Sequence, residues 1–132
     1  MPTSPLTLCL ILSTFLASIG QGAQATFRVH MSPTHGPYTA DQIKQEIARH
    51  WDVARRCIAE SDAVRQHHAF KGWTRYSMTI DPNGKVGSAR IEDGYLSGFD
   101  VCFKEKVLYK LVFPPVAERA ATLTGFTLHA NE

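Results

Sequence analysis

The first 25 residues of this 132-residue chain contain no Asp, Glu, Lys or Arg. Their apolar run, Leu6–Ala17, is shorter than the roughly 20 residues that a transmembrane helix needs. Ala23-Gln24-Ala25 then supplies the small-x-small pattern that signal peptidase accepts. We therefore predict that residues 1–25 form a signal peptide cleaved after Ala25. Because the residues before the apolar run lack the usual Lys or Arg, an uncleaved N-terminal anchor is the alternative.

The chain also lacks a large excess of either charge. It has 14 basic and 12 acidic residues, a net charge of +2, and the basic residues are scattered. This balance argues against nucleic acid and anionic membrane surfaces as partners. Cleavage would leave Thr26–Glu132, enough for one small domain without stable membrane insertion. We predict an extended lead-in at 26–38, rich in Pro, Gly, Ser and Thr, and the domain itself at 39–132.

Cysteine is scarce. Of three cysteines, Cys9 lies in the predicted leader, which leaves Cys57 and Cys102. An even number in a small exported domain favours a disulfide. Such a bridge would stabilise the domain by about 3–5 kcal/mol. The alternative is two buried free thiols in a protein that stays in the cytosol.

Catalytic and metal-binding patterns are missing as well. The chain has no C-x-x-C, no H-x-x-x-H and no Gly-rich phosphate loop, and Ser97 is not in a G-x-S-x-G context. His67-His68 is interpreted as solvated surface, and Glu92-Asp93 as a charge pair at the end of a hairpin. We accordingly predict a non-enzymatic protein with no catalytic residue, no bound metal and no cofactor.

The hydrophobic pattern predicts two helices. Thr39 and Gln42 have capping-box spacing at the start of the first, which fades near 62–66. Its apolar face consists of Ile43, Ile47, Trp51, Ala54, Cys57 and Ile58. The second helix is predicted from Phe99 to about Val112, where Pro114-Pro115 stops it. Cys102 lies on its apolar stripe, so each helix brings one inward cysteine.

Three strands complete the pattern, at 73–80, 85–95 and 122–129. Asp81-Pro82-Asn83-Gly84 predicts a turn between the first two, and a change of phase indicates a bulge near Gly87. The order α-β-β-α-β predicts an α+β fold. In it, a three-stranded antiparallel sheet carries two helices on one face.

Five segments in this order resemble the TonB C-terminal-like domains, and more closely their AgmX/PglI C-terminal branch, over residues 40–130. They are Arg56-Cys57-Ile58, Tyr76–Ile80, Asp81–Val86, Val101-Cys102 and Leu111–Pro114. The hairpin alone is common, whereas the paired cysteines followed by Phe113-Pro114 are more specific. TonB itself has an inner-membrane anchor, a long Pro-rich spacer and an energised partner complex. This sequence has no Pro-rich spacer and is not expected to keep an anchor, so the family's energy-transducing role is not carried over.

The resemblance implies a periplasmic or secreted envelope module that binds an unidentified protein partner. TonB-like sheets accept a partner segment as an added strand on a free edge. Candidate edges are the 85–95 and 122–129 strands. Candidate partner-binding residues are Trp73, Thr127 and His129, although Trp73 can also be interpreted as the rim of the core. The rival functions are a small secreted enzyme or enzyme inhibitor, and a membrane-tethered envelope component.

Cleavage is testable directly. The protein recovered from the periplasm should begin at Thr26 when its N-terminal sequence is determined. A protein that still begins at Met1 would contradict cleavage and would favour the anchored alternative.

Overall fold

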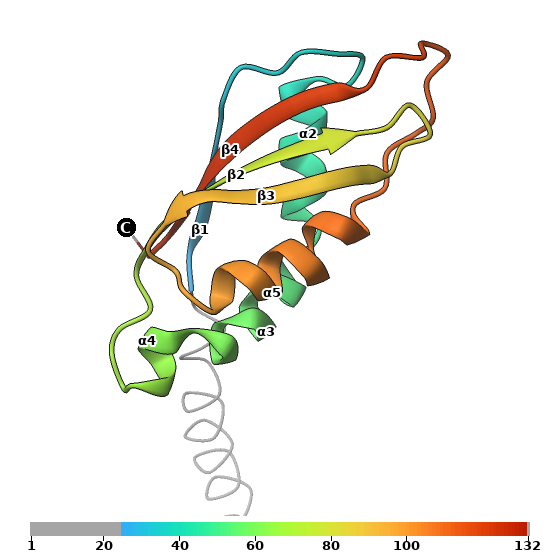
Figure 1. The fold of residues 1–132 in the computed structure, drawn as a ribbon. Coiled ribbons are helices and arrows are strands. Elements are labelled where there is room, and N and C mark those ends of the chain that lie inside the picture. Colours follow the sequence, from blue (N-terminus) through green and yellow to red (C-terminus); the bar gives the residue numbers. More distant parts are fainter. Residues whose placement is uncertain (1–24, 132) are drawn as a thin grey trace, which may run out of the picture.

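The computed structural model describes residues 25–131, which form an α+β fold (Figure 1). The strands are β1 (Phe27–Met31), β2 (Gly72–Ile80), β3 (Val86–Gly94) and β4 (Thr122–Ala130). The helices are α2 (Ala40–Ala48), α3 (Trp51–Cys57), α4 (Asp62–Arg65) and α5 (Phe99–Lys106), with short 3-10 helices η1 (Ile58–Glu60) and η2 (Leu108–Lys110). Residues 1–24 of the predicted leader, Ala23 among them, lie outside the described residues, whereas Ala25 is buried.

The sheet has four strands, not the three predicted. All its pairings are antiparallel, in the order β1-β4-β2-β3. The extra strand, β1, lies in the segment predicted to be an unstructured lead-in. Its apolar residues Phe27, Val29 and Met31 do alternate with polar ones, but its partner is β4, about 100 residues away in sequence. Local composition does not reveal a pairing over that distance.

The β2–β3 hairpin agrees closely with the prediction. The register passes from Thr79↔Ser88 to Ile80↔Val86, so Gly87 is the extra residue of a bulge. A second bulge, at Glu92, was not predicted. The turn depends on Gly84, whose φ is +91° and where an added Cβ would lie 1.9 Å from the Phe113 carbonyl oxygen.

The first helical region begins as predicted. The Thr39 side chain accepts from the Gln42 N–H while the Gln42 side chain accepts from the Thr39 N–H, which completes the capping box. The prediction of one continuous helix was wrong, because the chain turns at Arg49–His50 and continues as α3, η1 and α4. This break lets the Trp51 ring stack on Phe27, with ring centroids 5.1 Å apart.

The second helical region is shorter than predicted. It remains α-helical only to Lys106 and ends as η2, before the prolines. Its start is fixed by Gly98, whose φ is +87° and where a Cβ would lie 2.2 Å from the Glu60 carbonyl oxygen. Phe99 and Phe103 are fully buried against the sheet, where the Phe103 ring packs 5.3 Å from that of Tyr76.

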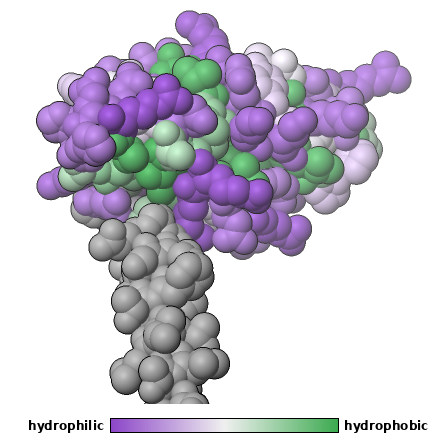
Figure 2. Space-filling model, turned by 90° about the horizontal axis from the view of Figure 1, so that it is seen from below, coloured by the Kyte–Doolittle hydropathy of each residue, from purple (hydrophilic) through white to green (hydrophobic). Residues whose placement is uncertain are grey.

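The helices gather on one side of the sheet, with α3 and α5 side by side (Figure 1). Cys57 and Cys102 join these two helices in a disulfide with Cα atoms 5.6 Å apart, as predicted. Seen from below, this side is mostly hydrophilic, with apolar residues showing between the polar ones (Figure 2). The sheet therefore buries one face under the helices, and its opposite face lies away from them.

The bridge should contribute strongly to stability. Its partners are 45 residues apart, and closing a loop of that length stabilises the folded state by about 4 kcal/mol. Replacing Cys57→Ser should lower the free energy of unfolding by about that amount in urea denaturation. The double variant Cys57→Ala/Cys102→Ala is the control, since it buries no hydroxyl, and it should match the reduced wild type. Two titratable thiols in the native protein would contradict the bridge.

Candidate functional site

The outward face of the sheet holds all three predicted partner-binding residues. Trp73 on β2 lies directly opposite His129 on β4, and Thr127 is two residues along β4 from His129. The structure therefore brings Trp73, Thr127 and His129 into one patch. Their binding of a partner stays a prediction.

Sequence reasoning missed three neighbours of these residues. β1 adds Arg28 opposite His129 and His30 opposite Thr127, while β2 adds Arg75 on the other side of Thr127. We call the six residues the basic grid: Arg28, His129 and Trp73 in one row, and His30, Thr127 and Arg75 in the next. The sequence did not place Arg28 and His30 on this face because β1 was not predicted as a strand. The period-two pattern of β2 already put Arg75 on the same face as Trp73.

An aromatic pair borders the grid. The Trp73 ring meets the Tyr95 ring edge-on, with centroids 5.1 Å apart, and the Tyr95 N–H donates to the Trp73 carbonyl at 2.8 Å. Trp73 is half-buried, whereas Tyr95 is 70% exposed. Trp73 thus supports Tyr95 and also presents part of its own ring on the outward face.

The topology corrects one of the two predicted edges. β4 is an interior strand between β1 and β2, so the 122–129 strand offers no free edge. The Ser32 N–H donates to the Gly125 carbonyl at 2.9 Å, and alternation from that pair points the backbone groups of Val29 away from β4. Val29 is only 4% exposed, which leaves little room for a partner strand along β1.

The edge of β3 is closed at one residue by a side chain. The Ala89 N–H donates to the Tyr109 hydroxyl oxygen at 3.1 Å, and that hydroxyl lies 3.4 Å from the Ala89 carbonyl. One phenol therefore occupies both backbone groups that Ala89 turns away from β2. By the alternation of an antiparallel ladder, Ile91 also turns its N–H and C=O outward. Within residues 25–131, no hydrogen bond from another segment reaches these groups of Ile91.

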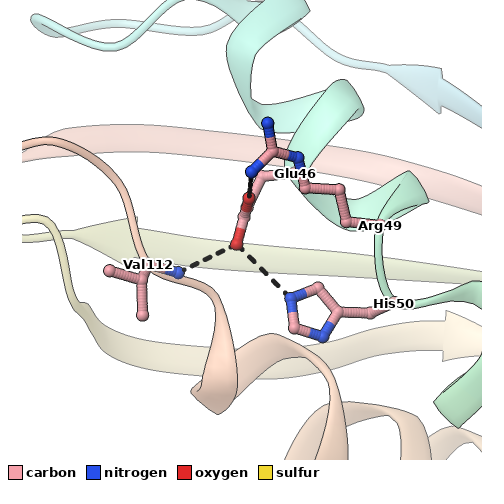
Figure 3. Close-up of polar contacts among 4 residues, drawn as sticks. All are labelled: Glu46, Arg49, His50 and Val112. Carbon is pink, nitrogen blue, oxygen red and sulfur yellow. Dashed lines mark hydrogen bonds and ion pairs between the residues drawn. The ribbon is translucent and has the colours of Figure 1, made fainter.

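A carboxylate holds the segment that carries Tyr109 (Figure 3). Glu46 on α2 accepts from the Val112 N–H at 3.2 Å and lies 3.3 Å from the His50 ring nitrogen and 3.8 Å from the Arg49 guanidinium. Val112 forms a β-bridge with Lys85, at the start of the β3 edge. Glu46 therefore fixes the chain just after Tyr109 against that edge.

Two tyrosines have perturbed acidity. Burial, with a smaller contribution from Asp100, raises the pKa of Tyr76 far above its usual range. Burial, and then Glu118, also raises the pKa of Tyr38, whose hydroxyl donates to the Pro114 carbonyl at 2.6 Å. Both phenols stay protonated at neutral pH, and we interpret them as core and loop anchors.

Among residues 25–131, no three His, Cys, Asp or Glu side chains lie close enough to hold a metal ion. No helix of the described part is both long and apolar enough to cross a bilayer.

Comparison with known proteins finds no matching family model, no matching curated protein and no matching solved structure. The candidate site therefore rests on the residues and geometry given above.

The Glu46 contact yields a stability prediction. Glu46→Ala removes the acceptor of the Val112 N–H and should lower the free energy of unfolding by about 1–3 kcal/mol. Glu46→Gln keeps an acceptor oxygen and should lose less. Urea denaturation measures both, with Glu105→Ala, an exposed helical glutamate without an ion pair to residues 25–131, as the matched control. Equal stability of Glu46→Ala and wild type would exclude this role.

Proposed function

We propose that this protein is an exported, non-enzymatic binding module of the cell envelope that accepts a partner strand along the β3 edge. The observation that carries the proposal is the state of that edge. A single hydroxyl occupies the outward groups of Ala89, and those of Ile91 have no bonding partner within residues 25–131.

A partner strand would bond better than the tyrosine does. Backbone N–H···O bonds in a sheet cluster near 2.9–3.0 Å, whereas the Tyr109 contacts are 3.1 and 3.4 Å. Tyr109 is 43% exposed, so its ring has solvent on one side into which it can swing. Its release would free the two outward backbone groups of Ala89. With the two groups that Ile91 already leaves unbonded to residues 25–131, four backbone groups would then be available to a partner strand.

The surroundings of the edge suit a selective contact. Exposed Tyr95 and Val112 offer apolar surface near its two ends. Arg90, Glu92 and Asp93 place both charge signs along the strand, which penalises unmatched strands. The two bulges shorten the regular edge further, so only a short segment would pair.

Export is part of the same proposal. The sequence argument is the short apolar run Leu6–Ala17 followed by Ala23-Gln24-Ala25, and the Cys57–Cys102 bridge supports an oxidising compartment. The alternative form, tethered by a retained leader, would present the same β3 edge to its partner.

The proposal is tested with a proline at the edge. Ile91→Pro removes the outward N–H that a partner strand would use, and Ile91→Ala is the matched control because it keeps the N–H while losing the side chain. Partners captured from an envelope extract by wild type should be retained by Ile91→Ala and lost by Ile91→Pro. With one captured partner added back, the Ala89 and Ile91 amides should exchange hydrogen more slowly.

Tyr109→Phe sharpens the test, because it frees the Ala89 groups without changing the ring. Capture should strengthen by about 2- to 10-fold, the equivalent of about one net hydrogen bond. Partners that bind Ile91→Pro and Ile91→Ala equally well, with circular dichroism showing both folded, would refute strand addition.

A further inference from the structure

Two arginines of the basic grid carry positive charge that no acidic group of residues 25–131 pairs with. Arg28 and Arg75 are exposed, and neither guanidinium makes an ion pair or hydrogen bond with any side chain or backbone group of residues 25–131. Basic side chains from two strands therefore flank β4 on adjacent rows.

Acidic residues are absent from the outward positions of β1, β4 and β2. These positions are held by Arg28, His30, Leu123, Gly125, Thr127, His129, Trp73, Arg75, Ser77 and Thr79. The nearest acids are on β3, where Glu92 accepts from the Ser77 hydroxyl and lies 3.8 Å from Arg90. Asp93 is opposite Arg75 in the register yet forms no ion pair with it.

We infer that the basic grid binds an acidic segment of a polypeptide. Guanidinium groups pair best with planar carboxylates, in two parallel hydrogen bonds. Arg28 and Arg75 are two strands apart and two residues apart along the strands, so the strand spacing of about 4.8 Å and the rise of about 3.4 Å per residue separate their Cα atoms by roughly 12 Å. Thr127 and His129 lie between them on β4. This spacing fits two separate carboxylates better than one compact anion.

Two other ligands, the chain's own leader and a nucleic acid, fit the basic grid less well. The chain's own first 25 residues contain no Asp or Glu, so they cannot supply the carboxylates. The small net charge of +2 disfavours a nucleic acid, whose binding needs many phosphate contacts. The half-buried Trp73 ring adds apolar contact for an extended peptide. This site uses the face of the sheet, so it does not depend on strand addition at the β3 edge.

A pair of synthetic peptides tests the inference on the purified full chain. One alternates Glu and Ser over eleven residues, and the other has Gln in place of every Glu. Isothermal titration should show binding of the Glu peptide at low salt, at least tenfold weaker binding of the Gln peptide, and weaker binding as salt is raised.

Charge-removing variants locate the site. Arg28→Gln and Arg75→Gln should each weaken binding of the Glu peptide at least tenfold. Trp73→Phe should weaken it by less than either arginine variant does. Arg56→Gln, an exposed arginine on α3 on the helical side, is the matched control and should stay within twofold of wild type.

Three results would overturn the assignment. They are no binding of the Glu peptide up to millimolar concentration, equal losses in Arg56→Gln and Arg75→Gln, or tighter binding of a single-stranded oligothymidine than of the Glu peptide. Ile91→Pro should bind the Glu peptide like wild type. A failure of strand addition and a failure of the basic grid are therefore distinguishable.

Discussion

The pairing of β1 with β4 is the contact on which the rest of the structure depends. It joins the first and last strands of the described chain, from Phe27↔Ala130 to Met31↔Phe126, and so makes β4 an interior strand. The outward residues of β4 then have neighbours on both sides. Without β1, Thr127 and His129 would border solvent, and the basic grid would lose Arg28 and His30. The same pairing covers β4, so β3 is the remaining one of the two predicted edges.

The two sides of the sheet are stabilised by different means. On the helical side, the Cys57–Cys102 bridge links α3 to α5. The rings of Tyr76, Phe103 and Phe126 pack against one another there, with ring centroids 5.2–6.5 Å apart. A covalent link and close-packed aromatic rings make this side the rigid part of the domain. No helix of residues 25–131 covers the outward face, so its side chains are the ones that we expect a partner to contact.

Beside the β3 edge the backbone is held firmly, whereas the edge itself is covered by weak side-chain hydrogen bonds. Glu46 binds the Val112 N–H, and Val112 is paired with Lys85, so the chain beside the edge is well fixed. Tyr109 closes the edge itself only through its hydroxyl. A side chain on a fixed backbone can rotate away without disturbing the fold, whereas a backbone strand could not. This arrangement suits an edge that is protected when empty and open to a better-bonding strand.

Local sequence determined the elements whose signals are short in range. The capping box at Thr39, the turn and bulge between β2 and β3, the inward stripe of α5 and its cysteine all follow from spacings of a few residues, and the structure confirms them. The sequence also predicted that Thr127 and His129 point outward from their strand, whereas it left Trp73 between a partner-binding residue and the rim of the core. Tertiary structure alone decided that β1 is a strand, that β4 is interior, that the first helix breaks at Arg49–His50, and that Tyr109 closes the β3 edge. Each of these depends on a contact between residues distant in sequence, such as Phe27 with Trp51 or Ala89 with Tyr109. A periodic pattern reports which face of an element is apolar, but not which distant segment will cover it.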